Sequence, residues 1–368
     1  MSNGNRPSFE PCRDIMKREG INDADIAAFE ANFYFALNGN DVISESSVSP
    51  VRDLLEVENI RVSIDHKLLD RTVVCKLNGE IDNCLGSMKA KGLLNVKEDD
   101  SFIDMAVKQV LTLRQEFNCY KLKLLLMNSY KTSDETLSYI FSKYPNLLQE
   151  DIELLQSKIP KIHDSTFQPL GLDGTDHSSD VDEWCLPGHG ELFSSLIGSG
   201  RLDSLLQEGY KYMFVSNIDN AGASIDLNIL THFAGSGSPF MMECCKRNER
   251  DRTAGHICIR NSDMRIILRE KDMCAKDNYH SIIGVHRFCN TNNLWIRLDV
   301  LKEVWRKFPP RLPSVKYMNS VNDNNIKNFV QLKISVGTAI EFFSNSTAIC
   351  VPRVSLRKRY EYTPKCCL

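Results

Sequence analysis

Residues 74–92 read VCKLNGEIDNCLGSMKAKG, and the expected fold depends on this segment. Residues 72–77 are apolar and predict a buried strand, which ends in the polar turn Asn78–Gly79. A strand that ends in a glycine-bearing turn is a common phosphate-binding site in α/β proteins, because backbone N–H groups point at the ligand. Glu80 and Asp82, however, put two negative charges where a phosphate would lie. The residues leave three interpretations open: a phosphate loop, an altered phosphate loop and an ordinary loop.

The overall composition indicates a folded protein and does not favour a nucleic-acid or membrane partner. Hydrophobic residues make up 42% of the 368 residues, which is enough for a sizeable core, and the formal net charge is only −3, so we expect neither nucleic acid nor an anionic membrane as a partner. No apolar run reaches the roughly 18–20 residues that span a bilayer, and the first residues lack the apolar segment of a signal peptide. The thirteen cysteines include no C-x-x-C pair, which favours free thiols in the reducing cytoplasm.

Strand and helix patterns alternate through the first 235 residues, which predicts a largely parallel sheet flanked by helices. Ligands of such sheets bind beyond the carboxyl ends of the strands. Three expected strands end in the polar loops 78–79, 128–129 and 217–220, and these loops converge if the strands are neighbours. The expected strands are 72–77, 121–127, 211–216, 240–245, 256–259, 264–268, 329–334 and 348–351; the expected helices are 25–37, 102–117, 133–142, 192–207, 225–233 and 298–307; residues 171–182 are expected to form a polar loop.

The segment VSNIDNAGASID, residues 215–226, places Asp219 at the tip of an expected strand. A carboxylate there suits Mg²⁺, which prefers oxygen ligands. Asn217 and Asn220 have amides that suit the hydroxyls of a sugar or nucleotide. The alternative is a strand-to-helix turn in which Asp219 and Asn220 are only caps.

Two further segments combine polar side chains with glycine or tryptophan. In LPGHGEL, residues 186–192, the glycines around His189 allow a ligand to approach the backbone closely. The alternative is a tight turn with an incidental histidine. In NTNNLW, residues 290–295, three amides suit sugar hydroxyls. The alternative is a polar turn anchored by a buried Trp295.

Five segments, in order along the chain, resemble the UTP–glucose-1-phosphate uridylyltransferases, also called UDP-glucose pyrophosphorylases. The resemblance implies an α/β fold with a Rossmann-like (GT-A-like) nucleotidyltransferase domain, a mixed sheet flanked by helices. It also implies that UTP and glucose 1-phosphate give UDP-glucose and pyrophosphate with magnesium, a step of nucleotide-sugar and glycogen biosynthesis. The segments are LMNSYKTSDET (126–136), QSKIPKI (156–162), LPGHGELF (186–193), FVSNIDNAGASIDLNIL (214–230) and NTNNLW (290–295).

The loop at residues 77–92 differs from the corresponding loop of this family, which reads LNGGLGTSMGCKGPKS. Without gaps the present loop reads LNGEIDNCLGSMKAKG, so that Lys91 matches the family's triphosphate-binding lysine. Glu80 and Asp82 replace two glycines, and Met88 replaces a lysine. Further along the chain, Thr253 and Tyr360 also stand where the family has lysines. The resemblance therefore favours the second interpretation of this segment, an altered phosphate loop.

The resemblance also implies roles for individual residues. The nucleotide-binding residues hold uracil, the substrate-binding residues contact the sugar and phosphate, and one carboxylate holds magnesium. The expected nucleotide-binding residues are Leu77, Asn78, Gly79, Glu80, Gln156 and Gly188; the expected substrate-binding residues are His189, Asn217, Ile218, Asp219, Asn292 and Asn293; the expected metal ligand is Asp219 and the expected catalytic cation is Lys91.

The preferred hypothesis is a uridylyltransferase in which glucose 1-phosphate attacks the α-phosphorus of UTP in line. The alternatives are a catalytically impaired protein that only binds UDP-sugar or uridine, and a related pyrophosphorylase for another sugar. We expect an N-terminal helical and irregular extension at 1–70, the nucleotidyltransferase domain at 71–353 and a short basic tail at 354–368. The family's C-terminal left-handed β-helix domain, through which it assembles, has no match here, so we expect a monomer.

Overall fold

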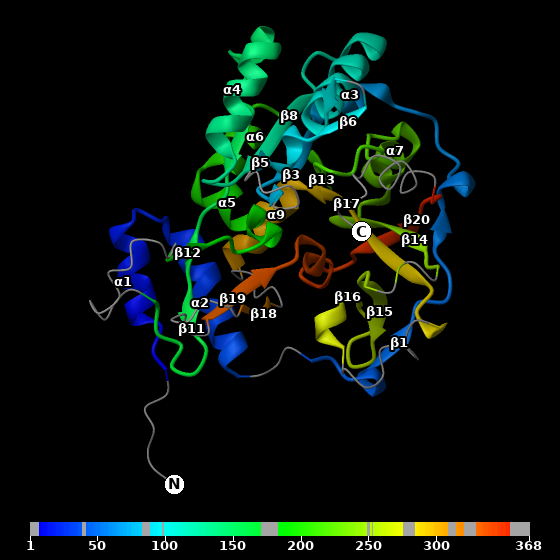
Figure 1. Ribbon diagram of the computed structural model, residues 1–368. Coiled ribbons are helices and arrows are strands. Elements are labelled where there is room, and N and C mark those ends of the chain that lie inside the picture. Colours follow the sequence, from blue (N-terminus) through cyan, green and yellow to red (C-terminus); the bar gives the residue numbers. More distant parts are fainter. Residues whose placement is uncertain are drawn as a thin grey trace.

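The computed structural model describes residues 7–38, 42–82, 89–97, 99–170, 183–248, 251, 253–274, 284–307, 314–319 and 329–353 (Figure 1). The helices are α1 (Glu10–Arg18), α2 (Asp23–Leu37), α3 (Phe102–Phe117), α4 (Ser133–Lys143), α5 (Leu192–Gly198), α6 (Arg201–Gln207), α7 (Leu227–Ser236) and α9 (Leu298–Lys307), with the short 3₁₀ helices η6 (His189–Glu191), η7 (Lys271–Met273) and η9 (Val336–Glu341) used below. The strands are β1 (Val48–Pro50), β2 (Leu55–Glu56), β3 (Thr72–Asn78), β4 (Ile81–Asp82), β5 (Lys89–Ala90), β6 (Asn95–Lys97), β7 (Asp100–Ser101), β8 (Lys123–Asn128), β9 (Glu153–Leu155), β10 (Ile159–Pro160), β11 (Ile162–His163), β12 (Trp184–Cys185), β13 (Tyr212–Asn217), β14 (Phe240–Lys246), β15 (His256–Arg260), β16 (Ile266–Arg269), β17 (Phe288–Arg297), β18 (Ser314–Asn319), β19 (Phe329–Ile334) and β20 (Thr347–Cys350).

The central sheet is mixed, with the strand order β2-β20-β14-β17-β13-β3-β8-β9. β17 is antiparallel to both of its neighbours in this order, and the other strands pair in parallel. β15 extends the sheet from β17 and pairs with β1 and β16. This arrangement confirms the predicted α/β class with a mixed sheet.

Helices cover both faces of this sheet, and the sequence of β3 explains why. Every residue of β3 is buried, because a strand sends successive side chains to opposite faces and both faces are covered. Val73 and Cys75 belong to the core that contains side chains of α5 and α6, whereas Val74 belongs to the core that contains side chains of α3 and α7. A mostly apolar strand is thus the expected sequence for the centre of this sheet, and the buried polar side chains of Lys76 and Asn78 are hydrogen-bonded.

Most expected elements are present, and two segments differ from expectation. The expected helix 192–207 is two helices, α5 and α6, because Gly200 between them has a left-handed φ of +74°. The segment NTNNLW is part of the ten-residue strand β17 and not a turn. The expected polar loop at 171–182 lies outside the described residues.

The described residues among the first 70 are built into the same fold. β2 pairs in parallel with β20 at the edge of the central sheet, β1 pairs with β15, and α2 packs on α5. The expected basic tail, 354–368, lies outside the described residues. None of the helices that the structure describes is both long and apolar enough to cross a membrane.

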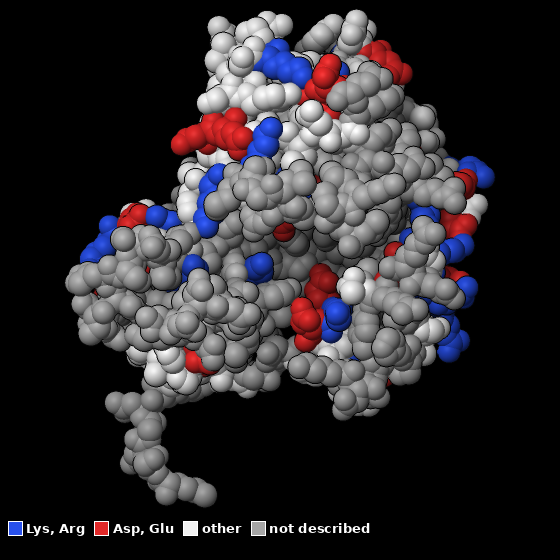
Figure 2. Space-filling view, viewed as in Figure 1, with Lys and Arg blue, Asp and Glu red and all other residues white. Residues whose placement is uncertain are grey.

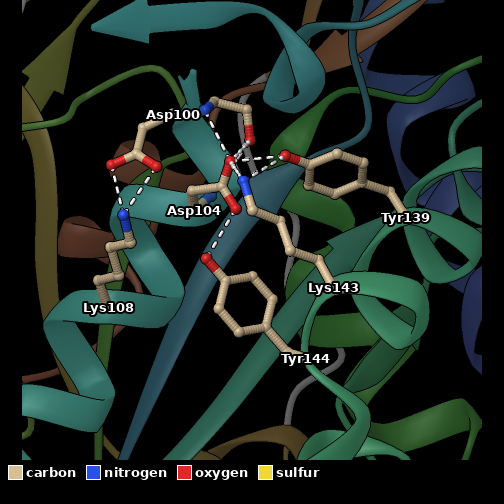
Figure 3. Close-up of polar contacts among 7 residues, drawn as sticks. Asp100, Asp104, Lys108, Tyr139, Lys143 and Tyr144 are labelled. Carbon is tan, nitrogen blue, oxygen red and sulfur yellow. Dashed lines mark hydrogen bonds and ion pairs between the residues drawn. The ribbon is translucent and has the colours of Figure 1, made fainter. Parts of the chain in front are cut away.

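A buried carboxylate joins α3 to α4 beside the sheet (Figure 3). Asp104 is fully buried and accepts hydrogen bonds from Tyr139 at 2.6 Å and from Tyr144 at 2.7 Å, and Lys143 Nζ lies 2.9 Å away. It also forms a capping box with Ser101 at the start of α3. Burial alone would raise the pKa of Asp104, but these donors hold that pKa well below its ordinary value.

We expect Asp104→Asn to lower the free energy of unfolding at pH 7 by about 2–3 kcal/mol, because several bonds to a charged acceptor are lost. The stability that ionised Asp104 contributes is fully present above the unfolded pKa of about 3.9. It is lost progressively as the pH falls from that value toward the lower pKa of the folded state. Urea unfolding at pH 7 and pH 3 measures both effects. Asp100→Asn is the matched control, since Asp100 forms only a partly exposed pair with Lys108 and should cost less than about 1 kcal/mol. Equal losses in both variants would contradict this account.

Candidate active site

A cavity of about 530 Å³ lies at the carboxyl edge of β3 and β13, and this volume suits a small-molecule ligand. Figure 2 shows charged side chains of both signs around a hollow in the middle of this face. All but two of the residues predicted as site residues line the cavity. The lining residues are Leu77, Gly79, Glu80, Lys91, Met127, Gln156, Leu186, Gly188, His189, Asn217, Ile218, Asp219, Thr253, Glu270, Lys271, Asp272, Asn292, Lys333, Ile334 and Ser335.

Strand register brings the three polar loops together, as the sequence predicted. β3 pairs in parallel with β13 so that Leu77 lies opposite Asn217, and with β8 so that Asn78 lies opposite Asn128. Parallel neighbours end at the same edge of a sheet, so the loops after these strands share one crevice.

Lys91 stands between two carboxylates in the cavity. Its Nζ lies 2.9 Å from Asp219 and 3.2 Å from Glu80. Burial of the amine lowers the pKa of Lys91, but the two carboxylates outweigh this effect and raise that pKa above its ordinary value. The amine is therefore charged at neutral pH, and it already balances part of the negative charge of the site.

The loop that carries Glu80 folds back on itself as a short hairpin. β4 pairs with β5, and the Lys91 N–H donates to the Glu80 carbonyl at 3.0 Å, which holds both side chains at the cavity. Asp82 is buried in β4 and does not line the cavity, so only one of the two acidic replacements faces a ligand there. Gly86 and Met88 lie outside the described residues.

His189 has a defined tautomer. The Val336 N–H donates to its Nδ1 at 2.9 Å, so Nδ1 is the acceptor and the proton of the neutral ring lies on Nε2. Burial lowers the pKa of His189; Glu80 raises that pKa and Lys333 lowers it, with a net decrease. The residue is thus a neutral hydrogen-bond donor through Nε2 in the cavity lining.

Glycines are required where the predicted nucleotide-binding residues meet. Gln156 Nε2 donates to the Gly188 carbonyl at 2.7 Å. Gly188 has a φ of +91°, and a Cβ there would lie 2.6 Å from the Ile334 carbonyl oxygen. A Cβ on Gly79 would lie 2.6 Å from Gln156 Oε1. Both glycines therefore allow the close packing of this end of the cavity.

A bulge in β17 turns Asn292 toward the cavity. The β14–β17 register shifts between Glu243 and Cys244, and Asn292 has a φ of +59°, which asparagine tolerates better than most residues. Asn290 supports this conformation, because its Oδ1 accepts from the Asn292 N–H at 2.9 Å and its Nδ2 donates to Asn292 Oδ1 at 2.6 Å. The motif NTNNLW thus forms a bulged strand that places one amide in the site.

Two predicted residues lie outside the cavity because their amides are used inside the protein. Asn78 is fully buried and its Nδ2 donates to Asn128 Oδ1 at 2.8 Å. Asn293 is 3% exposed; its Nδ2 donates to Glu243 at 2.8 Å, and its Oδ1 accepts from Asn220 at 3.1 Å. Both side chains support the loops of the site and, unlike the other predicted site residues, do not line the cavity.

Several residues of the cavity lining were not predicted from the sequence. Glu270, Lys271, Asp272, Lys333 and Ser335 line the cavity but belong to the β16–η7 and β19–η9 segments, far along the chain from the recognised motifs. None of them lies in a glycine-bearing turn after a parallel strand, so no local pattern marked them. Thr253, noted as a replacement for a family lysine, also lines the cavity.

The fold and the cavity define an α/β protein with a mixed sheet flanked by helices and a ligand-sized cavity at the carboxyl ends of its parallel strands. The chain belongs to the UTP–glucose-1-phosphate uridylyltransferase family, whose sequence model matches residues 27–361. It is 34% identical over 289 residues to the UTP–glucose-1-phosphate uridylyltransferase of Solanum tuberosum, covering 78% of this chain and 58% of that protein. It is 31% identical to the enzyme of Saccharomyces cerevisiae, covering 77% of this chain and 56% of that protein. The chain thus spans somewhat more than half the length of these relatives.

Solved structures agree with this assignment. A mutant of the UDP-glucose pyrophosphorylase from Leishmania major, in complex with UDP-glucose, superposes with a TM-score of 0.86 and 34% identity over 96% of this chain and 76% of that one. The UDP-glucose phosphorylase from Trypanosoma brucei superposes with a TM-score of 0.85 and 36% identity over 97% of this chain and 76% of that one. At these levels of identity, the likeness extends beyond the fold to the family.

We expect His189 to titrate below the ordinary histidine pKa of about 6.5 and to be the Nε2–H tautomer when neutral. Nitrogen-15 NMR of the imidazoles, assigned with His189→Gln, measures both properties. Lys333→Ala should raise this pKa and Glu80→Gln should lower it, because each removes one neighbouring charge. A midpoint above 6.5, or an Nδ1–H tautomer, would show that the Val336 contact does not form in solution.

Proposed function

We propose that this chain transfers the uridylyl group of UTP to glucose 1-phosphate, which yields UDP-glucose and pyrophosphate. Membership of the family supports this function, and so does a cavity that holds a charged lysine, a half-buried aspartate and several neutral hydrogen-bonding groups. The observation that carries the proposal is the Lys91–Asp219 pair at 2.9 Å, in the same cavity as Gln156 and His189. The pair offers a cation and a metal ligand where a phosphate chain would have to bind.

Magnesium fits this site as a partner of the substrate and not as a fully protein-bound ion. No group of three or more His, Cys, Asp or Glu side chains that could hold a metal occurs among the residues described here. Mg²⁺ usually keeps several waters and binds through one or two carboxylates together with substrate phosphates. Asp219, with 14% of its side chain exposed in the cavity, would be that carboxylate.

The charge of the lining also favours a divalent cation. The lining contains three lysines and four acidic side chains, so its formal charge does not attract a triphosphate. When bound, Mg²⁺ would neutralise phosphate oxygens and lower the electrostatic cost of bringing two phosphorylated substrates together. We therefore include Mg²⁺ in the proposed reaction.

The residues of this chain contribute position and charge. We assign the nucleobase to Gln156 and Gly188, where the glycine backbone allows close approach, and sugar hydroxyls to the amide of Asn292. The charged Lys91 would stabilise the negative charge that develops during in-line transfer, and the Nε2–H of His189 would donate to a phosphate or sugar oxygen. No covalent intermediate with the protein is needed, since the sugar phosphate itself attacks the α-phosphorus.

We also propose the cytoplasm as the location of the protein. All ten cysteines within the described residues are buried free thiols, including Cys75 and Cys258 in strands of the sheet. Such thiols persist in a reducing compartment.

The test of the function is release of pyrophosphate from UTP and glucose 1-phosphate with Mg²⁺, measured beside the binding of UDP-glucose by calorimetry. We expect both turnover and binding. Binding without turnover would instead identify a non-catalytic UDP-sugar-binding protein. Turnover only with a different sugar phosphate would identify a related pyrophosphorylase.

We expect Asp219→Asn to lower kcat/KM by about 100-fold or more, because a metal in such a site contributes several kcal/mol of charge stabilisation. Raising the Mg²⁺ concentration should recover part of the loss. Asp203→Asn is the control, since Asp203 lies on α6, pairs with Lys302 and does not line the cavity. An Asp219→Asn variant with normal activity and normal Mg²⁺ dependence would remove Asp219 from the metal site.

We expect Glu80→Gln to tighten UTP binding about threefold, because Lys91 then faces one carboxylate fewer. The effect is small because 71% of the Glu80 side chain is exposed and solvent screens its charge. Calorimetry at one fixed ionic strength measures it. Unchanged or weaker UTP binding would show that the glutamate in this loop does not oppose the triphosphate.

A further inference from the structure

The part of the cavity wall that β19 contributes is hydrogen-bonded to the His189 turn. β19 and the residues that follow it make three contacts with residues 186–189: Gln331 Nε2 donates to the Leu186 carbonyl at 2.6 Å, Ile334 N–H donates to the Pro187 carbonyl at 2.9 Å, and Val336 N–H donates to His189 Nδ1. These contacts fix the position of the strand relative to the ring of His189.

Lys333 lies in the middle of this wall. In an extended segment alternate side chains share a face, so Gln331, Lys333 and Ser335 point to the same side. Lys333 is exposed and lines the cavity, whereas Gln331 is buried against residue 186. The ammonium is near enough to His189 to lower its pKa. The positive charge therefore faces the same space as the proposed phosphate-binding groups.

Lys271 belongs to the same wall. Ser335 Oγ donates to Glu270 Oε1 at 2.9 Å, which ties the end of β19 to the start of η7, and β16 packs on η9 (Figure 1). Lys271 follows Glu270 and also lines the cavity. Burial raises the pKa of Glu270, and its Oε1 is already bound by Ser335. Asp272 is the remaining acidic side chain of this wall.

We propose that Lys333, together with Lys271, forms a second phosphate-binding wall of the active site. The inference rests on the proposed function and names residues that no motif assigns. Lys91 is shared between Asp219 and Glu80, so it does not by itself balance the several negative charges of UTP and glucose 1-phosphate. The two wall lysines supply the further positive charge, and their ligand is a phosphate oxygen, either of the sugar phosphate or of the pyrophosphate end of UTP.

The experiment is calorimetry of uridine, UTP, glucose 1-phosphate and pyrophosphate with the full chain and with Lys333→Met, in Mg²⁺ at one ionic strength. We expect Lys333→Met to weaken binding of phosphorylated ligands about tenfold, as for loss of one charge-assisted contact, and to leave uridine unchanged. A selective loss for glucose 1-phosphate assigns the sugar phosphate, and a selective loss for UTP and pyrophosphate assigns the leaving group. Lys271→Met should act in the same direction.

Three further variants separate a phosphate contact from a structural effect. Lys333→Arg should stay within about threefold of the parent protein, because arginine also binds phosphate. Asp272→Asn should tighten the phosphorylated ligands, because it removes negative charge from the same wall. Lys302→Met, which alters an exposed lysine of α9 paired with Asp203, should change nothing.

The outcomes distinguish this inference from the proposed function. If Lys333→Met binds all phosphorylated ligands as the parent does, the second wall is wrong, even if the parent makes UDP-glucose. An equal loss for uridine would also contradict it, because it would indicate a distorted cavity. If the parent binds UTP through Lys333 but releases no pyrophosphate, the wall stands and the proposed function fails.

Discussion

The in-register parallel pairing of β3 with β13 and β8 is the constraint on which the site depends. It places Leu77 opposite Asn217 and Asn78 opposite Asn128, so that the loops after all three strands end at one edge. A shift of one residue would send every side chain of β3 to the opposite face of a sheet that is buried on both sides. Because such a shift would disrupt both hydrophobic cores, the register of β3 is fixed. The register in turn fixes the positions of the loops and of the Lys91–Asp219 pair.

Below this edge, buried polar groups hold the loop that carries Asp219. Lys76 is 2% exposed, and its Nζ donates to Ser216 Oγ at 2.9 Å and to the Ala223 carbonyl at 2.7 Å, which joins β3 to both ends of the loop. Burial lowers the pKa of Lys76 to about 7. Asn220 is held from the other side through Asn293, whose amide is bound to Glu243. The aspartate therefore stands on a hydrogen-bonded polar network, which limits its movement.

The sequence predicted the parts of this protein that depend on local patterns. Apolar runs predicted β3 and β13, and the family resemblance implied that His189 and Asp219 belong to one site. Both residues line the same cavity. The sequence did not predict the bulge at Asn292, because a bulge depends on the register between two strands that are distant in sequence. Lys333 was not predicted for the same reason. An exposed lysine in a strand has no local sequence pattern that marks a binding site, and only the contacts of β19 with residues 186–189 bring it to the cavity.

The charge balance of the cavity explains how an altered glycine loop is compatible with a polyphosphate ligand. Glu80 adds a negative charge at the loop, but it is paired with Lys91 and mostly exposed, so its repulsion is partly neutralised and screened. Asp82 does not line the cavity and adds little. With Thr253 in the lining where the family has a lysine, the lysines of the lining are Lys91, from the loop after β3, and Lys271 and Lys333, from the β16–η7 and β19 segments. The position of positive charge in this site therefore follows from the whole fold, and the loop sequence alone is a poor guide to how strongly phosphate binds.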